Sequence, residues 1–384
     1  GATPMSDLAI VKLKPAKKYL RDYYLIPEKA DAFQENDIMM GIKYLRVLAD
    51  RFRQPLVILL GLGSNYGSHT GSSPLSQVAQ NYGGFFGIAT VIAAGNETGL
   101  AHHYAGRLSA DTSYEDVELR VGKKEAERGF ILELWSSATE LYTVGFVSPG
   151  GERINRIPIL ANNETRIPFL LENTTVTVNY ELIEAGSGSQ LVSMRFEKPS
   201  AGIWTIRVYN TQFLTGDYHM WLPVQSFISD ETVFLKPDPS NTITVPGNSR
   251  LPITVGAYDH RNNSIYIHSS RGYISRDSVK PDLAAPGVDV LGPANTSVHS
   301  GILKNTQTFT HRTGTSAAAA ITAGAVANLL NWGIVMGNYP TMSEASIKSY
   351  LIRGASRNPS LSYPNREFGY GTLDLLQTFL KLRE

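Results

Sequence analysis

The spacing of apolar residues changes twice along this chain of 384 residues, and that change restricts the fold more than any other feature. Up to about residue 100, continuous apolar runs typical of buried parallel strands alternate with stretches of helical period. From about 112 to 235, apolar and polar residues alternate as in half-buried strands. From about 244 the first pattern returns. The simplest fold that fits is an α/β domain interrupted by an all-β insert, divided as 1–105, 112–235 and 244–384.

The first α/β part predicts strands and helices in alternation, which implies a parallel sheet with right-handed crossovers and helices on both faces. The run Leu56–Leu60 is apolar throughout, so we expect this strand to be buried on both faces. The expected elements of both α/β parts are strands at 8–13, 56–60, 88–93 and 251–257 and helices at about 36–52, 74–82, 317–330 and 344–353, the last capped by Ser343.

Composition excludes several classes of protein. The chain has no cysteine, which excludes disulfides, a cysteine nucleophile and thiolate metal sites. The formal net charge is +1, so the basic excess of a nucleic-acid-binding protein is missing. We expect no membrane span, because the most apolar stretch, 317–330, is short and better suited to a buried helix. Without an acidic loop of the calcium-binding type, we expect no metal and no cofactor.

A serine stands at the start of a run of very small residues, Gly314-Thr315-Ser316 followed by four alanines. A helix of such residues can pack closely against a sheet. Its N-terminus would direct unpaired N–H groups and positive dipole charge toward Ser316, where an oxyanion would be stabilised. Gly314 leaves room for a substrate backbone. The alternative is a structural helix that Ser316 merely caps.

Two glycine-containing segments follow predicted strands. In Ala93-Ala94-Gly95-Asn96, an asparagine follows a predicted buried strand, and an ordinary turn asparagine is one interpretation of it. In Gly61-Leu62-Gly63, two glycines one residue apart directly follow the run 56–60. A dinucleotide-binding loop is a weaker alternative for the second segment, since its third glycine falls one position late and the following helix is delayed.

These segments resemble the serine motif, the oxyanion motif and the substrate-pairing edge of the subtilisin-like (S8) serine proteases. Residues 253–257, 280–288 and 368–374 resemble further segments of that family. The resemblance implies that Ser316 is the nucleophile and Asn96 the oxyanion donor. It implies a substrate-binding set of Gly61, Leu62, Gly63, Ala93, Gly95, Gly314 and Thr315. Most members have proline where this chain has Ala320, a difference that leaves the nucleophile unaffected.

The position of the all-β insert narrows the resemblance to the clostridial Csp germination proteases, over nearly the whole chain. Residues 8–14, 33–38, 68–71 and 202–208 carry it. It implies a jelly-roll-like insert, a bacterial protein in an extracytoplasmic or spore-associated setting, and a peptide or protein substrate. It also implies a second partner, the protein's own N-terminal segment or prodomain. We expect the insert to brace the cleft, with a carbohydrate-binding module as the alternative by analogy of fold.

The other two members of the catalytic triad are not found. In this family the order along the chain is Asp, His, Ser. The resemblance places the histidine in a Gly-Thr-His helix start shortly before a strand like 8–13, and none of the eight histidines has that setting. Neither His69 nor His311 is assigned as a general base. A serine without a base is a poor nucleophile, so we expect this chain alone to be inactive.

Three functional alternatives therefore stay open. In the first, the Asp and His lie upstream of Gly1 or on a separate chain, and the protein is a serine endopeptidase. In the second, it is a pseudoprotease that binds peptides or a partner without cutting them. In the third, a β-sandwich binds a ligand and the α/β part is a scaffold. We favour the first, because both Ser316 and Asn96 are present.

Overall fold

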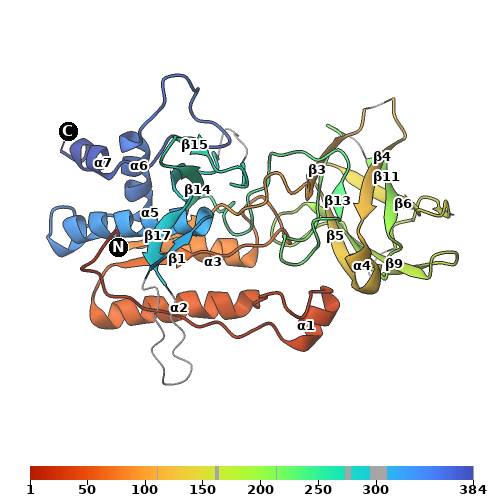
Figure 1. The fold of residues 1–384 in the computed structure, drawn as a ribbon, viewed down its shortest axis with the longest axis horizontal. Helices are drawn as coiled ribbons and strands as arrows, with labels where there is room; N and C mark the ends of the chain where they lie inside the picture. The colour runs from red at the N-terminus through yellow and green to blue at the C-terminus, as the bar shows by residue number, and fades with distance from the viewer. Residues whose placement is uncertain (110, 161–163, 213, 273–277, 295–308, 384) are drawn as a thin grey trace.

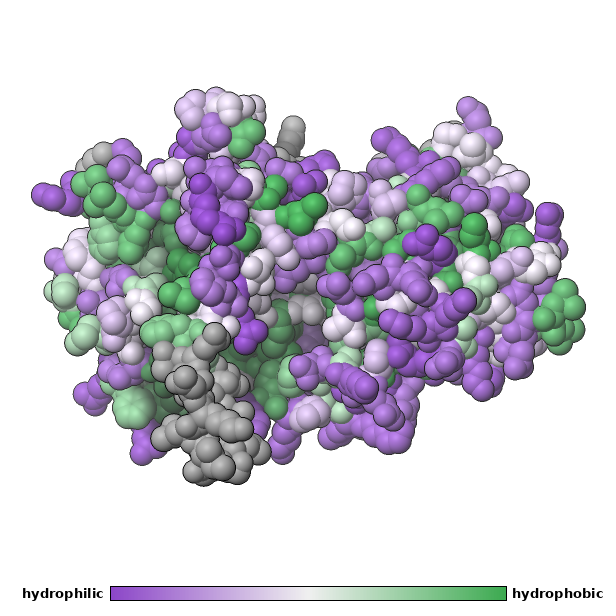
Figure 2. All heavy atoms as spheres, viewed as in Figure 1, coloured by the Kyte–Doolittle hydropathy of each residue, from purple (hydrophilic) through white to green (hydrophobic). Residues whose placement is uncertain are grey.

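The structure, a computed structural model, describes residues 1–384 except 110, 161–163, 213, 273–277, 295–308 and 384. Its α/β elements and its antiparallel strands form two bodies that lie side by side (Figure 1). The N-terminal segment runs along the α/β body and reaches the antiparallel body at α1 (Lys18–Tyr23). The space-filling view shows apolar side chains gathered in a hollow near the middle of the face it presents (Figure 2).

A mainly parallel sheet forms the centre of the α/β body. Its order is β1-β2-β14-β15, with β16 also paired to β14. The pairs β1–β2, β2–β14 and β14–β16 are parallel, and only the short β15 is antiparallel. Because parallel strands end at one edge, the loops after β1 and β2 become neighbours. The bounds are β1 (Leu56–Leu60), β2 (Ile88–Ala93), β14 (Ile253–Asp259), β15 (Ser264–Ile265) and β16 (Leu283–Pro286).

Helices cover both faces of this sheet, as predicted. On one face, α2 (Glu35–Phe52) and α3 (Pro74–Gly83) enclose a core with β1 and β2. On the other face, α5 (Thr315–Leu330) and α6 (Glu344–Gly354) pack on β2, β14 and β16, with α7 (Leu375–Lys381) alongside. The α5 side chains are mostly small, which brings this helix close to the sheet. The capping of α6 by Ser343 is confirmed, with the Ser346 N–H as the donor.

Two predictions about the first strands are wrong. Residues 8–13 form no strand, and Leu8 and Ile10 are 86% and 84% exposed. The strand β1 is not buried on both faces, because Leu59 is 43% exposed. Among the described residues, only β2 pairs with β1, so β1 is an edge strand and residues 8–13 have no strand to pair with.

The insert consists of two antiparallel sheets that enclose one large apolar core. The orders are β3-β12-β5-β10-β9-β8 and β13-β4-β11-β6-β7. The alternation seen in the sequence is reproduced, with inward residues such as Trp204, Ile206 and Val208 fully buried. The bounds are β3 (His103–Arg107), β4 (Tyr114–Val121), β5 (Gly129–Ser136), β6 (Leu141–Val147), β7 (Arg153–Ile154), β8 (Thr165–Phe169), β9 (Thr174–Glu181), β10 (Gln190–Glu197), β11 (Gly202–Gln212), β12 (Asp217–Trp221) and β13 (Val233–Phe234), with helix α4 (Lys123–Arg128) before β5.

The helix α5 is longer than the sequence predicted, because a π-helical turn, η1 (Asn331–Val335), continues it. The combined 21 residues are long and apolar enough to cross a membrane, by length and composition alone. However, 56% of the most apolar window is buried within the molecule. A buried core helix meets the same criterion, so this helix is weak support for a membrane span.

Candidate active site

Ser316 lies in the first turn of α5, one residue after the start of the helix, and its side chain is exposed. The N-cap is Gly314, whose φ of 142° requires glycine, so the simple capping role for Ser316 does not apply. Ser316 Oγ donates a hydrogen bond of 2.9 Å to the Gly61 carbonyl at the end of β1. The N–H of Ser316 belongs to the first helical turn, where no intrahelical acceptor exists.

Asn96 lies directly beside this helix start. Its Oδ1 accepts the N–H of Thr315 at 3.0 Å and the Thr315 hydroxyl at 3.2 Å. With Oδ1 engaged, Nδ2 is on the other side of the amide, and it would lie 3.3 Å from a Cβ placed on Gly314. Among the described residues Nδ2 has no acceptor. An amide donor without a partner, next to an exposed serine, can stabilise an oxyanion.

Thr315 and Gly95 hold the loop that carries Asn96 against the start of α5. Thr315 is fully buried, and its Oγ1 also accepts the N–H of Gly95 at 3.1 Å. Gly95 has a φ of 106°, which a residue with a side chain rarely adopts. Ala93 is buried at the end of β2. Thr315 therefore contacts the oxyanion donor rather than the open cleft.

The segment after β1 forms the opposite side of the site. Gly61 and Gly63 are exposed, whereas Leu62 is half-buried against the core below α2. The next residue, Ser64, pairs with Val245 through two backbone hydrogen bonds of 3.0 and 2.8 Å. Thr244, which precedes Val245 and lies against Gly63, could not be predicted from the sequence. It lies between the insert and β14 and belongs to no motif.

No described histidine reaches Ser316. His311, on the hairpin of β17 (Val290–Pro293) and β18 (Phe309–Arg312), pairs instead with Asp289 at 3.0 Å. His69 stacks on Trp221 with ring centroids 3.8 Å apart. Burial lowers the pKa of His69 to about 4, which keeps it neutral at pH 7. His299 is outside the described residues. Among the described residues, Ser316 and Asn96 therefore lie together without a histidine close enough to act as a base.

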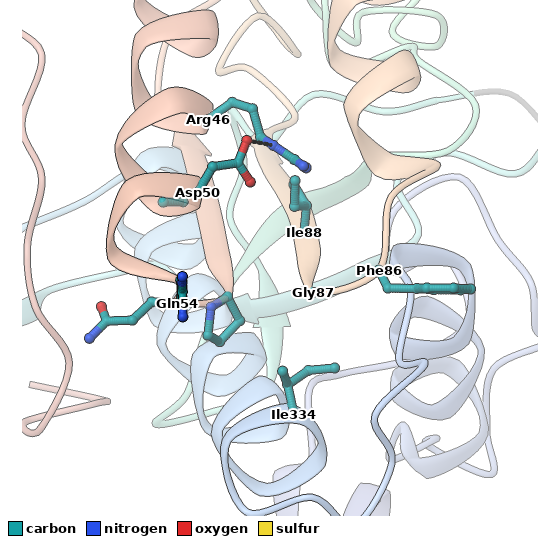
Figure 3. A pocket seen from close by; sticks show the side chains of 10 residues that line it. Arg46, Asp50, Gln54, Phe86, Gly87, Ile88 and Ile334 are labelled. Atoms are coloured by element: carbon teal, nitrogen blue, oxygen red, sulfur yellow. Dashed lines mark hydrogen bonds and ion pairs between the residues drawn. The ribbon is translucent and has the colours of Figure 1, made fainter.

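Two cavities lie elsewhere. One of about 310 Å³ is at the opposite ends of β1 and β2 from Ser316, between Gln54, Gly87 and Ile334 (Figure 3). The second, of about 490 Å³, adjoins α5 at Ile321 and the β17–β18 hairpin at His311. Within the described part of the chain, no group of three or more His, Asp or Glu side chains is placed to hold a metal ion.

Comparisons with known proteins agree with this geometry. A family model described as the subtilase family matches residues 229–371. The structure of the Clostridium perfringens CspB protease is similar, with 30% identity and a TM-score of 0.81, covering 92% of this chain and 72% of that one. The serine protease AprX of Bacillus subtilis (strain 168) is 32% identical over 129 residues, which are 31% of this chain and 28% of AprX.

A serine at the start of a buried small-residue helix, beside an asparagine amide at the end of a parallel sheet, is an arrangement typical of serine hydrolases of the subtilisin type. With 30% identity over most of the CspB chain, this chain belongs to the subtilase family of S8 serine proteases and is close to the Csp type. Peptides or proteins are the substrate class of that family. The AprX match spans less than a third of AprX, so nothing of AprX as a whole transfers to this chain.

Proposed function

We propose that this chain is the nucleophile-bearing part of a subtilisin-like serine endopeptidase. Ser316 Oγ attacks the scissile carbonyl and forms the tetrahedral intermediate. Asn96 Nδ2 and the Ser316 N–H hold the oxyanion. The catalytic Asp and His come from a segment outside this sequence, upstream or on a separate chain. The observation that carries the proposal is the pair of hydrogen bonds that Thr315 donates to Asn96 Oδ1. They leave Asn96 Nδ2 without an acceptor among the described residues.

The open edge of the sheet supports a missing catalytic segment. The strand β1 ends at Leu60, just before Gly61, whose carbonyl accepts from Ser316 Oγ, and its outer edge has no partner strand among the described residues. Exposed Leu59, Leu8 and Ile10 lie in the segments that such a strand would contact. An unpaired edge with apolar side chains is a template for an additional strand. A strand there would end next to Ser316, where a base is needed.

We further propose the division 1–105, 112–235 and 244–384, with the insert as a jelly-roll-like brace. Two hydrogen bonds join the insert to the loop at residues 65–67, which follows the candidate substrate-binding segment. Asn65 Nδ2 donates to the Leu222 carbonyl at 3.0 Å, and the Gly67 N–H donates to Glu133 Oε2 at 3.0 Å. A brace of this kind would fix the cleft wall without contacting substrate. The protein's own N-terminal segment or prodomain is the partner we propose for the open edge.

The second candidate is a pseudoprotease that binds peptides or a partner protein. It is favoured by one observation. The hydroxyl of Ser316 is bonded to a carbonyl, which cannot accept its proton as a general base would. In that case the same cleft would bind an extended segment without cleavage.

Labelling with a fluorophosphonate probe separates the two functions. We would compare this chain, the natural full-length protein, and Ser316→Ala in the full-length protein. Labelling of the full-length protein that is lost in Ser316→Ala is the expected result, with little or no labelling of this chain. A folded full-length protein that does not react would overturn the protease and leave peptide binding as the function.

A further inference from the structure

Thr244 fills the space between the two glycine segments beside Ser316. Its side chain is 4% exposed. A Cβ placed on Gly63 would collide with Thr244 Oγ1 and lie 2.7 Å from Thr244 Cβ. A Cβ placed on Gly95 would lie 2.7 Å from Thr244 Cγ2 and 2.8 Å from Ser270 Oγ. One threonine therefore occupies the room that side chains on either wall would need.

The backbone around Thr244 is held by both walls. The N–H of Thr244 donates to the Ala94 carbonyl at 3.0 Å. Val245, the next residue, exchanges two hydrogen bonds with Ser64. The segment cannot move away from one wall without breaking backbone hydrogen bonds to the other. The threonine is thus a fixed part of the site.

Gly61 and Gly63 mark the two ends of the interval between Ser316 Oγ and Thr244. A Cβ on Gly61 would lie 3.5 Å from Ser316 Oγ. Gly61 and Gly63 directly follow β1 and are two residues apart, a separation of roughly 7 Å in extended backbone. When the scissile carbonyl of a peptide lies between Ser316 Oγ and Asn96 Nδ2, the peptide residue that carries this carbonyl would direct its side chain into the interval between Gly61 and Gly63. That side chain would face Thr244.

We infer that Thr244 forms the floor of the pocket for the residue that supplies the scissile carbonyl (P1), and that it restricts this residue to Gly, Ala or Ser. The inference rests on the proposed function. A longer P1 side chain would have to displace a buried, clamped threonine. Inserting extra carbon into a filled site strains its surroundings, and one methylene changes kcat/KM by on the order of 10- to 200-fold.

The test uses the full-length protein and a proteome-derived peptide library, with cleavage sites identified by mass spectrometry. Wild type should cut after Gly, Ala and Ser. Thr244→Gly, which removes the floor, should raise cleavage after Leu or Phe relative to Ala by on the order of 10- to 200-fold. Thr244→Val keeps the volume without the hydroxyl and should keep the wild-type preference. If Thr244→Gly does not fold, Thr244→Ala should show the same change at smaller amplitude.

The outcomes separate this inference from the proposed function. A wild type that cuts mainly after large residues would overturn the inference and leave the protease intact. A preference that changes as much in Thr244→Val as in Thr244→Gly would also overturn it, because volume would not be the cause. If the full-length protein neither cleaves any peptide nor reacts with a fluorophosphonate, the proposed function fails, and the P1 assignment fails with it.

Discussion

Asn96 and Thr315 are joined by two hydrogen bonds, in which Asn96 Oδ1 accepts both the N–H and the hydroxyl of Thr315 at 3.0 and 3.2 Å. The two residues are 219 positions apart, and the contact ties the loop after β2 to the first turn of α5. It also orients the amide, because one of its two ends is committed to an acceptor role. The opposite end, Nδ2, lies beside Gly314, 3.3 Å from where a Cβ on that residue would be, and has no acceptor among the described residues.

Replacing Asn96 should separate its structural role, the acceptance of hydrogen bonds from Thr315, from its proposed role as a donor to the oxyanion. Asn96→Asp retains an acceptor for Thr315 but has no donor for the oxyanion. In the full-length protein we expect kcat to fall by about 10²–10³ with little change in KM, the loss known for such a donor in subtilisin. Steady-state kinetics measures both constants. An Asn96→Asp enzyme with an unchanged kcat would show that the amide does not contact the transition state.

The hydroxyl of Thr315 should act through Asn96 and Gly95 rather than on substrate. Thr315→Val has nearly the same shape but removes the hydroxyl that bonds to the partly buried Asn96 Oδ1 and Gly95 N–H. We expect the free energy of unfolding of this chain to fall by about 1–3 kcal/mol, measured by urea denaturation. In the full-length protein kcat should fall more than KM rises. Thr315→Ser, which keeps the hydroxyl, is the matched control, and equal losses in the two variants would contradict this role.

The contact between Gly63 and Thr244 can be tested without any activity. Gly63→Ala places a methyl group against the threonine, which should lower the stability of this chain by about 1–3 kcal/mol. Thr244→Gly removes the obstructing atoms. We expect the double variant to recover at least about 1 kcal/mol relative to the sum of the single changes. Urea denaturation of the four proteins gives this coupling, and strict additivity would mean that the two residues do not touch.

Stability should fall in acid because of histidines at the junction of the two bodies. His69 stacks on Trp221, and His103 lies 4.9 Å from the same ring and bonds to His219 at 3.0 Å. Burial is the main cause that lowers the pKa of His69 to about 4 and that of His103 to about 3. The remaining charged groups near them are Asp217 and Asp238, which act on His219.

The direction in which the free energy of unfolding changes with pH depends on whether the folded or the unfolded chain binds more protons. Below about pH 6.5 the unfolded chain protonates these rings while the folded chain does not. The free energy of unfolding should therefore decrease from about pH 6.5 toward pH 4, by up to about 1.4 kcal/mol per pH unit for each ring. Urea denaturation at pH 7 and pH 5 measures the difference. His69→Phe keeps the stacking without the titration and should lose less stability in acid; an identical pH dependence would exclude His69 as a source.

The sequence predicted most of the α/β elements, because their patterns are local. Ser343 at the start of α6 and the apolar run of β2 needed no knowledge of the neighbours. Residues 8–13 were predicted wrongly for the opposite reason. Their pattern suits a strand, but a strand exists only when another strand bonds to it, and no described strand does so. Leu59 on β1 is also exposed, although its run is apolar throughout.

What the sequence by itself determined is the subtilase-type α/β class and the family resemblance, and it predicted the candidate pair Ser316 and Asn96, since short motifs carry all three. Tertiary structure alone decided that Thr315 holds Asn96 and that Thr244 lies between Gly63 and Gly95. The physical reason is distance along the chain. Residues 63 and 244 are brought together only after the whole sandwich has been inserted between them, and no local pattern records which side chain will fill a gap between two glycines.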